Sequence, residues 1–181
     1  MKILAIADRK PDNLKETLEN NEFDLIITLW DLEYYCIKEL ELVSTPKIWV
    51  YWNHCTRWYM DNLWIQDLHL KTFEINWIIF WWFEWCVRYK HWNHFMYTQE
   101  EAIELIKSLP KVDVLISHCP PRWINDNDDS AHYWFDALRS YVDLYSPKAI
   151  LHWHTYDYWK FITQYNNTDV YYVEKSSIII L

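Results

Sequence analysis

The chain has 181 residues, about the size of one domain, and its net charge is −9. This acidity argues against a nucleic-acid-binding protein, which needs a basic face, and no apolar run is long enough to cross a membrane. The four cysteines form no C-x-x-C pair, which favours free thiols and a cytoplasmic protein over a disulfide framework. We therefore expect a single domain over residues 1–181 with neither nucleic-acid nor membrane partners.

The first half of the chain alternates short apolar runs with segments of helical periodicity. These patterns predict buried strands over residues 2–7, 25–29 and 47–51, and helices over 11–20 and 32–42. A β-hairpin is predicted over 68–83, with its turn at residues 74–77. The first half therefore indicates a sheet with helical crossovers.

The second half continues the alternation. An amphipathic helix is predicted over 99–109, where Thr98 and Glu101 make a capping box. A strand over 112–117, a helix over 135–144 and a strand over 148–151 follow, and closing strands are predicted over 161–164, 169–173 and 177–181. Strands that alternate with helices favour an α/β fold.

Glycine is absent, although average usage of about 7% predicts roughly 13 in a chain of this length. Tryptophan occurs 14 times, often where glycine belongs: after a Pro-Pro-Arg run at Trp123, in polar segments at Trp92 and Trp159, and as the pair Trp81-Trp82 near a strand end. We infer that tryptophan stands in place of glycine throughout.

Two tryptophans leave an alternative open. Trp49 and Trp77 lie in contexts that an ordinary core tryptophan in a strand would also fit. If residue 77 were glycine, however, Asn76 and residue 77 would form an Asn-Gly turn, the strongest short-range hairpin signal.

Metal-competent side chains end several of the predicted strands. They are Asp8, Asp31, Asn53, His118, His152 and His154. Ligands bind at the carboxyl ends of strands in open α/β sheets. A mixed set of carboxylate, amide and imidazole ligands suits Mn, Fe or Zn, and two such cations can clamp a phosphate.

Read with glycine for tryptophan, the order of the motifs resembles one known family. Trp30-Asp31 matches G-D, and Trp52-Asn53-His54-Cys55 matches most of G-N-H-[DE]. Residues 117–123 match S-H-x-P-P-x-G, residues 131–134 match an H-x-G segment, and His152-Trp153-His154-Thr155 matches H-G-H-T. Over nearly its full length the chain is thereby similar to the calcineurin-like metallophosphoesterases.

The resemblance implies a four-layer αββα sandwich with two divalent metal ions (Mn, Fe or Zn) that hydrolyses phosphomonoesters or phosphodiesters. It implies that Asp31 bridges the metals and that His54 acts near the leaving oxygen as an acid or charge stabiliser. The remaining ligands divide between the metals, with Asp8 and His154 on the first and Asn53, His118 and His152 on the second.

Two departures from the family pattern concern the chemistry. The D-x-H block reads Asp8-Arg9-Lys10, so a histidine ligand is missing, and Arg9 and Lys10 either bind phosphate or are a solvated pair. Cys55 replaces the acid expected after His54, which would orient that imidazole. Loss of such an orienting group typically lowers metal affinity or activity roughly 10–100-fold. The alternative to an enzyme is therefore a non-catalytic interaction module on the same fold.

The tryptophans themselves should impair the protein. Trp30, Trp52 and Trp153 flank proposed ligands, where an indole needs space that a close-packed site lacks. We expect the chain as written to be inactive, to fold unstably and to aggregate. A third reading takes Trp77, Trp81, Trp82 and Trp85 as a stacking platform for sugars or single-stranded nucleic acid, which the acidic charge disfavours.

Overall fold

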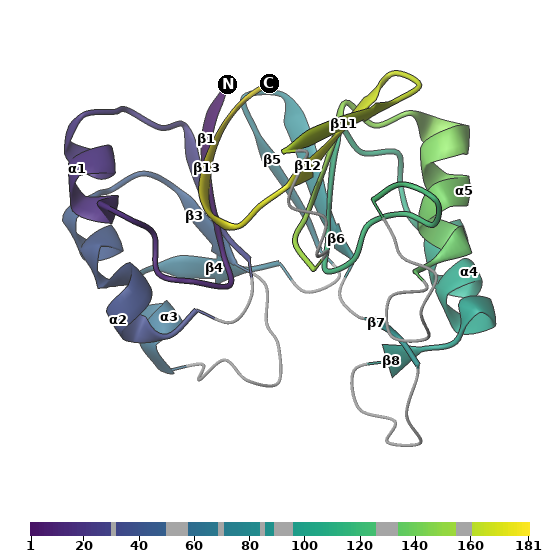
Figure 1. Cartoon of the computed structure of the whole chain (residues 1–181), viewed down its shortest axis with the longest axis horizontal. Helices are drawn as coiled ribbons and strands as arrows, with labels where there is room; N and C mark the ends of the chain where they lie inside the picture. The colour runs from purple at the N-terminus through teal and green to yellow at the C-terminus, as the bar shows by residue number, and fades with distance from the viewer. Residues whose placement is uncertain are drawn as a thin grey trace. The chain divides into compact units, whose positions relative to one another are not determined.

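The structure is a computed structural model that describes residues 1–29, 32–49, 58–68, 71–83, 86–88, 96–125, 134–154 and 161–181. It divides into two compact units (Figure 1). The first unit comprises Met1–His69 and Val173–Leu181, and the second comprises Leu70–Tyr172. No helix in these described segments is long and apolar enough to cross a membrane. The expectation of one domain over residues 1–181 stays a prediction.

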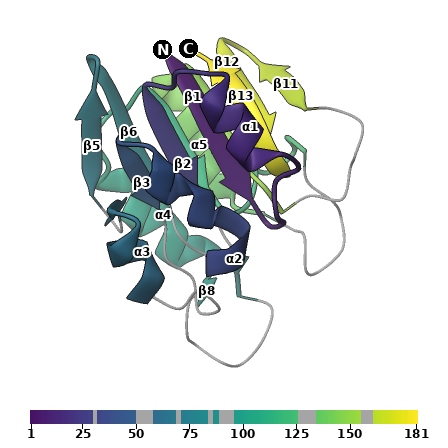
Figure 2. The same ribbon diagram turned by 90° about the vertical axis from the view of Figure 1, so that its left-hand side faces the viewer.

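The first unit contains a five-stranded sheet in the order β13-β1-β2-β3-β4. Its strands are β1 (Lys2–Ala7), β2 (Leu25–Thr28), β3 (Lys47–Trp49), β4 (Ile65–Asp67) and β13 (Lys175–Ile180). The first four are parallel, and β13 runs antiparallel along β1 (Figure 2). The amino group of Met1 donates to the Leu181 carbonyl at 2.7 Å, so this unit holds both chain ends.

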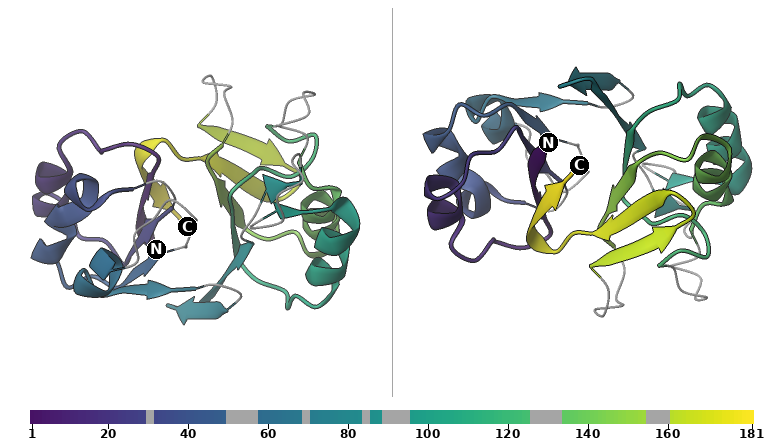
Figure 3. Two further views of the ribbon diagram at one scale, coloured as in Figure 1. Left: turned by 90° about the horizontal axis from the view of Figure 1, so that it is seen from below. Right: turned by 90° about the horizontal axis from the view of Figure 1, so that it is seen from above.

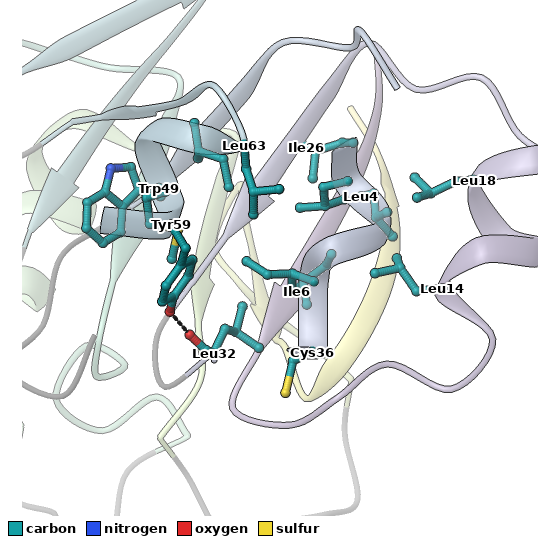
Figure 4. Close-up of a cluster of buried hydrophobic side chains, with 14 of the residues drawn as sticks. Leu4, Ile6, Leu14, Leu18, Ile26, Leu32, Cys36, Trp49, Tyr59 and Leu63 are labelled. Atoms are coloured by element: carbon teal, nitrogen blue, oxygen red, sulfur yellow. Dashed lines mark hydrogen bonds between the residues drawn. The ribbon is translucent and has the colours of Figure 1, made fainter. Parts of the chain in front are cut away.

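Short helices cover one face of this sheet (Figure 3). They are α1 (Leu14–Glu19), α2 (Tyr34–Ile37) with the 3₁₀ turn Lys38–Leu42 after it, and α3 (Trp58–Asn62). β1 and β2 read as continuous apolar runs, and nearly all of their residues are buried. Alternate residues such as Leu4 and Ile6 belong to the same cluster as Leu14 and Leu18 of α1 (Figure 4).

The second unit contains a six-stranded sheet in the order β11-β12-β10-β9-β6-β5. Its strands are β5 (Thr72–Ile75), β6 (Ile78–Phe83), β9 (Val114–Ser117), β10 (Ala149–His152), β11 (Ile162–Tyr165) and β12 (Thr168–Tyr172). The four inner strands are parallel, and each edge strand is the outer arm of an antiparallel hairpin. Helices α4 (Gln99–Lys107) and α5 (Asp136–Tyr145) lie side by side on one face (Figure 1).

Most predicted elements are confirmed. The capping box at Thr98 is present, with its hydroxyl accepting from the Glu101 N–H at 3.2 Å. The helix predicted over 11–20 begins only at Leu14, because Asn13 is left-handed, with φ 57°. The helix predicted over 32–42 is one α turn followed by a 3₁₀ turn, a common way for short helices to end.

Four elements were not predicted: α3, β4, β7 (Cys86–Val87) and β8 (Met96–Tyr97). All four are short, and they lie beside segments outside the described residues. A run of two to five residues is too short to show either period clearly. Their pairing within the fold decides their structure instead.

The described tryptophans occupy two kinds of position. Trp49, Trp82 and Trp134 are fully buried, which confirms the core reading of Trp49. The core reading of Trp77 is wrong, because this residue lies in the β5–β6 turn and is 90% exposed. Trp85 lies outside the described residues, and burial of Trp82 within β6 contradicts the proposed stacking platform.

Three exposed tryptophans have left-handed backbones. Trp64, Trp77 and Trp123 have φ of 52°, 62° and 67°, and they are three of ten described residues with positive φ. Four of the other seven are asparagines, the type for which this region is common. A bulky residue there is an outlier, whereas glycine adopts the conformation without a steric cost.

Candidate metal centre

Asp8 follows β1 directly and has φ 62°. Its Oδ2 lies 3.2 Å from Arg9 Nε, and Arg9 Nη1 lies 3.4 Å from Glu174 Oε1. The guanidinium of Arg9 therefore contacts two carboxylates of the first unit, while Lys10 is exposed. Phosphate binding by Arg9 and Lys10 stays a prediction. The predicted ligands Asp31 and Asn53, and the predicted acid His54 with its neighbour Cys55, lie outside the described residues.

The second unit brings two of its predicted histidines together. His118 follows β9, and His152 ends β10 two residues before His154. β9 and β10 are parallel neighbours, so their carboxyl ends meet at one edge of the sheet. The rings of His118 and His154 stack with centroids 4.7 Å apart and planes 24° apart. We call His118, His152 and His154 the histidine cluster.

Burial sets the charge of two members of this cluster, His118 and His152. It lowers the pKa of His118 well below its ordinary value, and the neighbouring His154 and His152 lower that pKa further. Burial also lowers the pKa of His152 to about 3, although a hydrogen bond to the Trp153 carbonyl opposes the shift. Both imidazoles are therefore neutral near pH 7, the form in which histidine binds a metal ion.

Two indoles pack against the stacked imidazoles. The ring of Trp153 lies edge-on to both His118 and His154, with centroids 5.0 Å away in each case. The ring of Trp134 lies 5.4 Å from His154 and 6.2 Å from His118. Both tryptophans are buried, so their indoles occupy the space beside the imidazoles.

The loop after His118 is tied to α5 and to itself. Pro121 bridges to Phe135, and the Arg122 N–H donates to the Phe135 carbonyl at 3.3 Å. Arg139 Nη1 donates to the Arg122 carbonyl at 3.3 Å. This loop places Asn125 Nδ2 3.2 Å from His152 Nε2. Sequence reasoning missed Asn125, because no local spacing relates it to a histidine 27 residues later.

The donors suit a divalent cation, but this chain leaves little room for one. Neutral imidazoles favour Zn, Fe or Mn over a hard cation such as calcium. Within the described residues, however, no three His, Cys, Asp or Glu side chains are placed to hold one ion. Glycine at positions 134 and 153 would remove both indoles from the cluster. The donor chemistry therefore fits a metal ion, while the indoles of Trp134 and Trp153 occupy the space beside the imidazoles.

Comparison with known proteins identifies the fold. No family model and no curated protein matches the sequence. Solved structures do match, among them TT1561 of Thermus thermophilus, with a TM-score of 0.59 and 12% identity over 94% of this chain and 88% of that one. Phosphopantetheinyl hydrolase (PptH) from Mycobacterium tuberculosis matches with a TM-score of 0.62 and 11% identity over 96% and 88% of the two chains. The chain is similar to both in its mixed α/β fold with two sheets and flanking helices, and one of these neighbours is named as a hydrolase.

Proposed function

We propose that this protein is a metal-dependent phosphoesterase whose natural polypeptide carries glycine at the 14 positions where tryptophan stands here. The observation that supports this function best is the pair of stacked imidazoles, His118 and His154, at the strand ends of a metallophosphoesterase-like fold, where burial lowers the pKa of His118 well below its ordinary value. We further propose that it works in the cytoplasm on phosphomonoesters or phosphodiesters.

The glycine part of the proposal is supported by backbone geometry. Trp64, Trp77 and Trp123 hold the left-handed conformation that costs a residue with a Cβ roughly 1–2 kcal/mol. Trp77 follows Asn76, and both have positive φ, as the Asn-Gly type I′ hairpin turn requires. A uniform replacement has a simple origin if one codon is read as tryptophan in this sequence and as glycine in the cell that makes the protein. The intact natural protein would then weigh less than 22.6 kDa.

The roles of the residues follow the family resemblance. Asp8 and His154 would hold one cation, Asn53, His118 and His152 would hold the other, and Asp31 would lie between them. Bound cations of this kind supply an activated water and neutralise charge on the phosphoryl group. His54 would give a proton to, or stabilise charge on, the leaving oxygen.

The chain as written should lack this activity. Indoles at Trp134 and Trp153 fill the volume beside the imidazoles, and overpacking commonly costs about 1–3 kcal/mol per site. Summed over 14 positions, even about 1 kcal/mol each reaches the roughly 5–15 kcal/mol by which a domain is stable. We therefore propose that this polypeptide folds unstably and aggregates.

A direct test compares this sequence with the glycine chain, defined as the same sequence with glycine at all 14 tryptophan positions. We expect only the glycine chain to melt cooperatively, and Mn²⁺-dependent hydrolysis of bis(4-nitrophenyl) phosphate to be confined to it. A chelator should abolish the hydrolysis, and His118→Gln should reduce it strongly without preventing folding. Equal melting and equal turnover by both chains would contradict the proposal.

One observation favours a second candidate, a non-catalytic interaction module. Arg9 stands near where the family has a histidine ligand, and its guanidinium contacts the Asp8 carboxylate at 3.2 Å. That carboxylate is then engaged by a cation of the chain itself. Metal titration of the glycine chain separates the candidates: two bound Mn²⁺ ions with turnover support the enzyme, and folding without metal binding supports the module.

A further inference from the structure

A chain of three side chains ends on the ring of His152. Thr163 Oγ1 on the edge strand β11 donates to Asn125 Oδ1 at 2.7 Å. The other end of the same amide, Nδ2, lies 3.2 Å from His152 Nε2. All three residues belong to the second unit, and His152 is fully buried.

Asn125 is held in place independently of its side chain. The Ile124 N–H donates to the Pro121 carbonyl at 3.0 Å, and Arg122 is bound through its backbone to both Phe135 and Arg139. Asn125 has φ 58°, a left-handed conformation that asparagine adopts readily. The loop therefore presents the amide to the histidine from a defined backbone position.

The direction of the hydrogen bonds assigns the tautomer of His152. Because Oδ1 of Asn125 accepts from Thr163, its Nδ2 is left to donate toward Nε2 of His152. Nε2 must then carry a lone pair, so the single ring proton of a neutral imidazole is on Nδ1. Nδ1 lies 3.4 Å from the Trp153 carbonyl, which can accept that proton.

We propose that Asn125 is a positioning residue that holds Nε2 of His152 and thereby sets the tautomer of this ring, and that Nδ1 is the nitrogen that would bind a divalent cation. The part that concerns the cation rests on the proposed function. The part that concerns the tautomer does not, because it follows from the two contacts of the Asn125 amide.

The same three side chains can serve the ring with and without a cation. A histidine that binds a metal through one nitrogen usually donates its other N–H to a fixed acceptor. If Nδ1 binds the cation, the proton moves to Nε2, and a half-turn of the Asn125 amide presents Oδ1 to it. Thr163 can follow, because a hydroxyl both donates and accepts. Reversal of the hydrogen-bond chain thus accompanies occupation of the site.

Asn125 could instead serve only the backbone, as a residue that tolerates positive φ. Asn125→Gly separates the two roles, because glycine keeps the left-handed backbone and lacks the amide. Asn166→Gly is the matched control, since Asn166 is also left-handed, with φ 51°, and lies in the β11–β12 turn. Asn125→Asp adds a group that only accepts, which should draw the ring proton to Nε2.

The experiment is long-range ¹H–¹⁵N NMR of histidine side chains in the glycine chain, first without metal and then with Zn²⁺. Without metal, we expect the Nδ1–H form of His152, loss of that form in Asn125→Gly, the Nε2–H form in Asn125→Asp, and no change in Asn166→Gly. With Zn²⁺, Nδ1 should become the bound nitrogen, and Asn125→Gly should weaken zinc affinity by roughly 10–100-fold.

The two parts of the inference fail separately. An unchanged His152 tautomer in Asn125→Gly would overturn the positioning role whatever zinc does. Zinc bound through Nε2 would overturn the assignment of Nδ1 to the cation. Absence of zinc binding in every chain would overturn both the proposed function and the cation part, while the metal-free spectra would still decide the role of Asn125.

Discussion

The β5–β6 turn offers the sharpest test of the glycine interpretation at a single position. Asn76 and Trp77 have φ of 51° and 62°, and the indole of Trp77 is 90% exposed. Restoring tryptophan there in the glycine chain forces a Cβ into the left-handed region, at roughly 1–2 kcal/mol. An exposed indole gains little from burial in return. Glycine itself loses about 0.5–1 kcal/mol to chain entropy on folding, so the difference between the mid-values predicts a net loss of stability of about 0.75 kcal/mol.

Urea unfolding of two chains measures this difference: the glycine chain, and a chain with glycine at every position except Trp77. The midpoint should fall in the chain that retains Trp77, while the slope with urea stays the same. Asn167→Gly is the control, because Asn167 is the second central residue of the β11–β12 turn but is not left-handed. Glycine there should give no gain. An unchanged or higher midpoint with Trp77 retained would refute the steric argument.

Three further predictions concern the stability of whichever chain unfolds cooperatively. Because burial lowers the pKa of His118 and His152, the unfolded state binds more protons below about pH 6.5. The free energy of unfolding should fall by roughly 1.5–2 kcal/mol per histidine between about pH 6.5 and about pH 5. Equal stability at these two pH values would contradict the burial of His118 and His152. Thr98→Ala should cost about 1 kcal/mol in urea unfolding by removing the cap of α4, whereas Thr98→Ser should restore it. Tyr141→Phe should lower the melting temperature through a loss of about 1–3 kcal/mol of folding stability, because the Tyr141 hydroxyl donates to the Pro110 carbonyl at 2.8 Å. An unchanged melting temperature would show that this hydrogen bond is dispensable.

Strands were predictable from sequence where burial on both faces leaves a continuous apolar run. β1 has the predicted bounds, Lys2–Ala7, because every residue from Ile3 to Ala7 is fully buried. The proximity of His118 and His154 was predictable to the same extent, because neighbouring parallel strands end at one edge of a sheet. Neither result needed knowledge of side-chain orientation.

Contacts between distant segments were not predictable. Asn125 meets His152 only because the loop after β9 is tied to α5. Those ties join backbone groups to one another and to the Arg139 guanidinium, and no local spacing in the sequence indicates them. The tautomer of His152 depends in turn on Thr163, which lies on an edge strand. A hydrogen-bond chain across three segments forms only once the fold has brought them together, so the sequence alone does not indicate it.

If tryptophan stands in place of glycine, as we propose, the hydrophobic pattern remains readable because tryptophan is apolar. Trp82 within β6 and Trp49 within β3 occupy buried strand positions, so the strand runs survive and the fold can still be inferred from them. The conflict arises only where the backbone needs the absence of a Cβ, as in the turn at Trp77, or where open space is needed, as beside His118. At these places glycine is suited because it has no side chain. A sequence can therefore specify its strands while side chains at its turns and beside the histidine cluster conflict with the backbone conformation or with the space available. Residue identity at those positions, rather than the fold, decides whether this protein can be an enzyme.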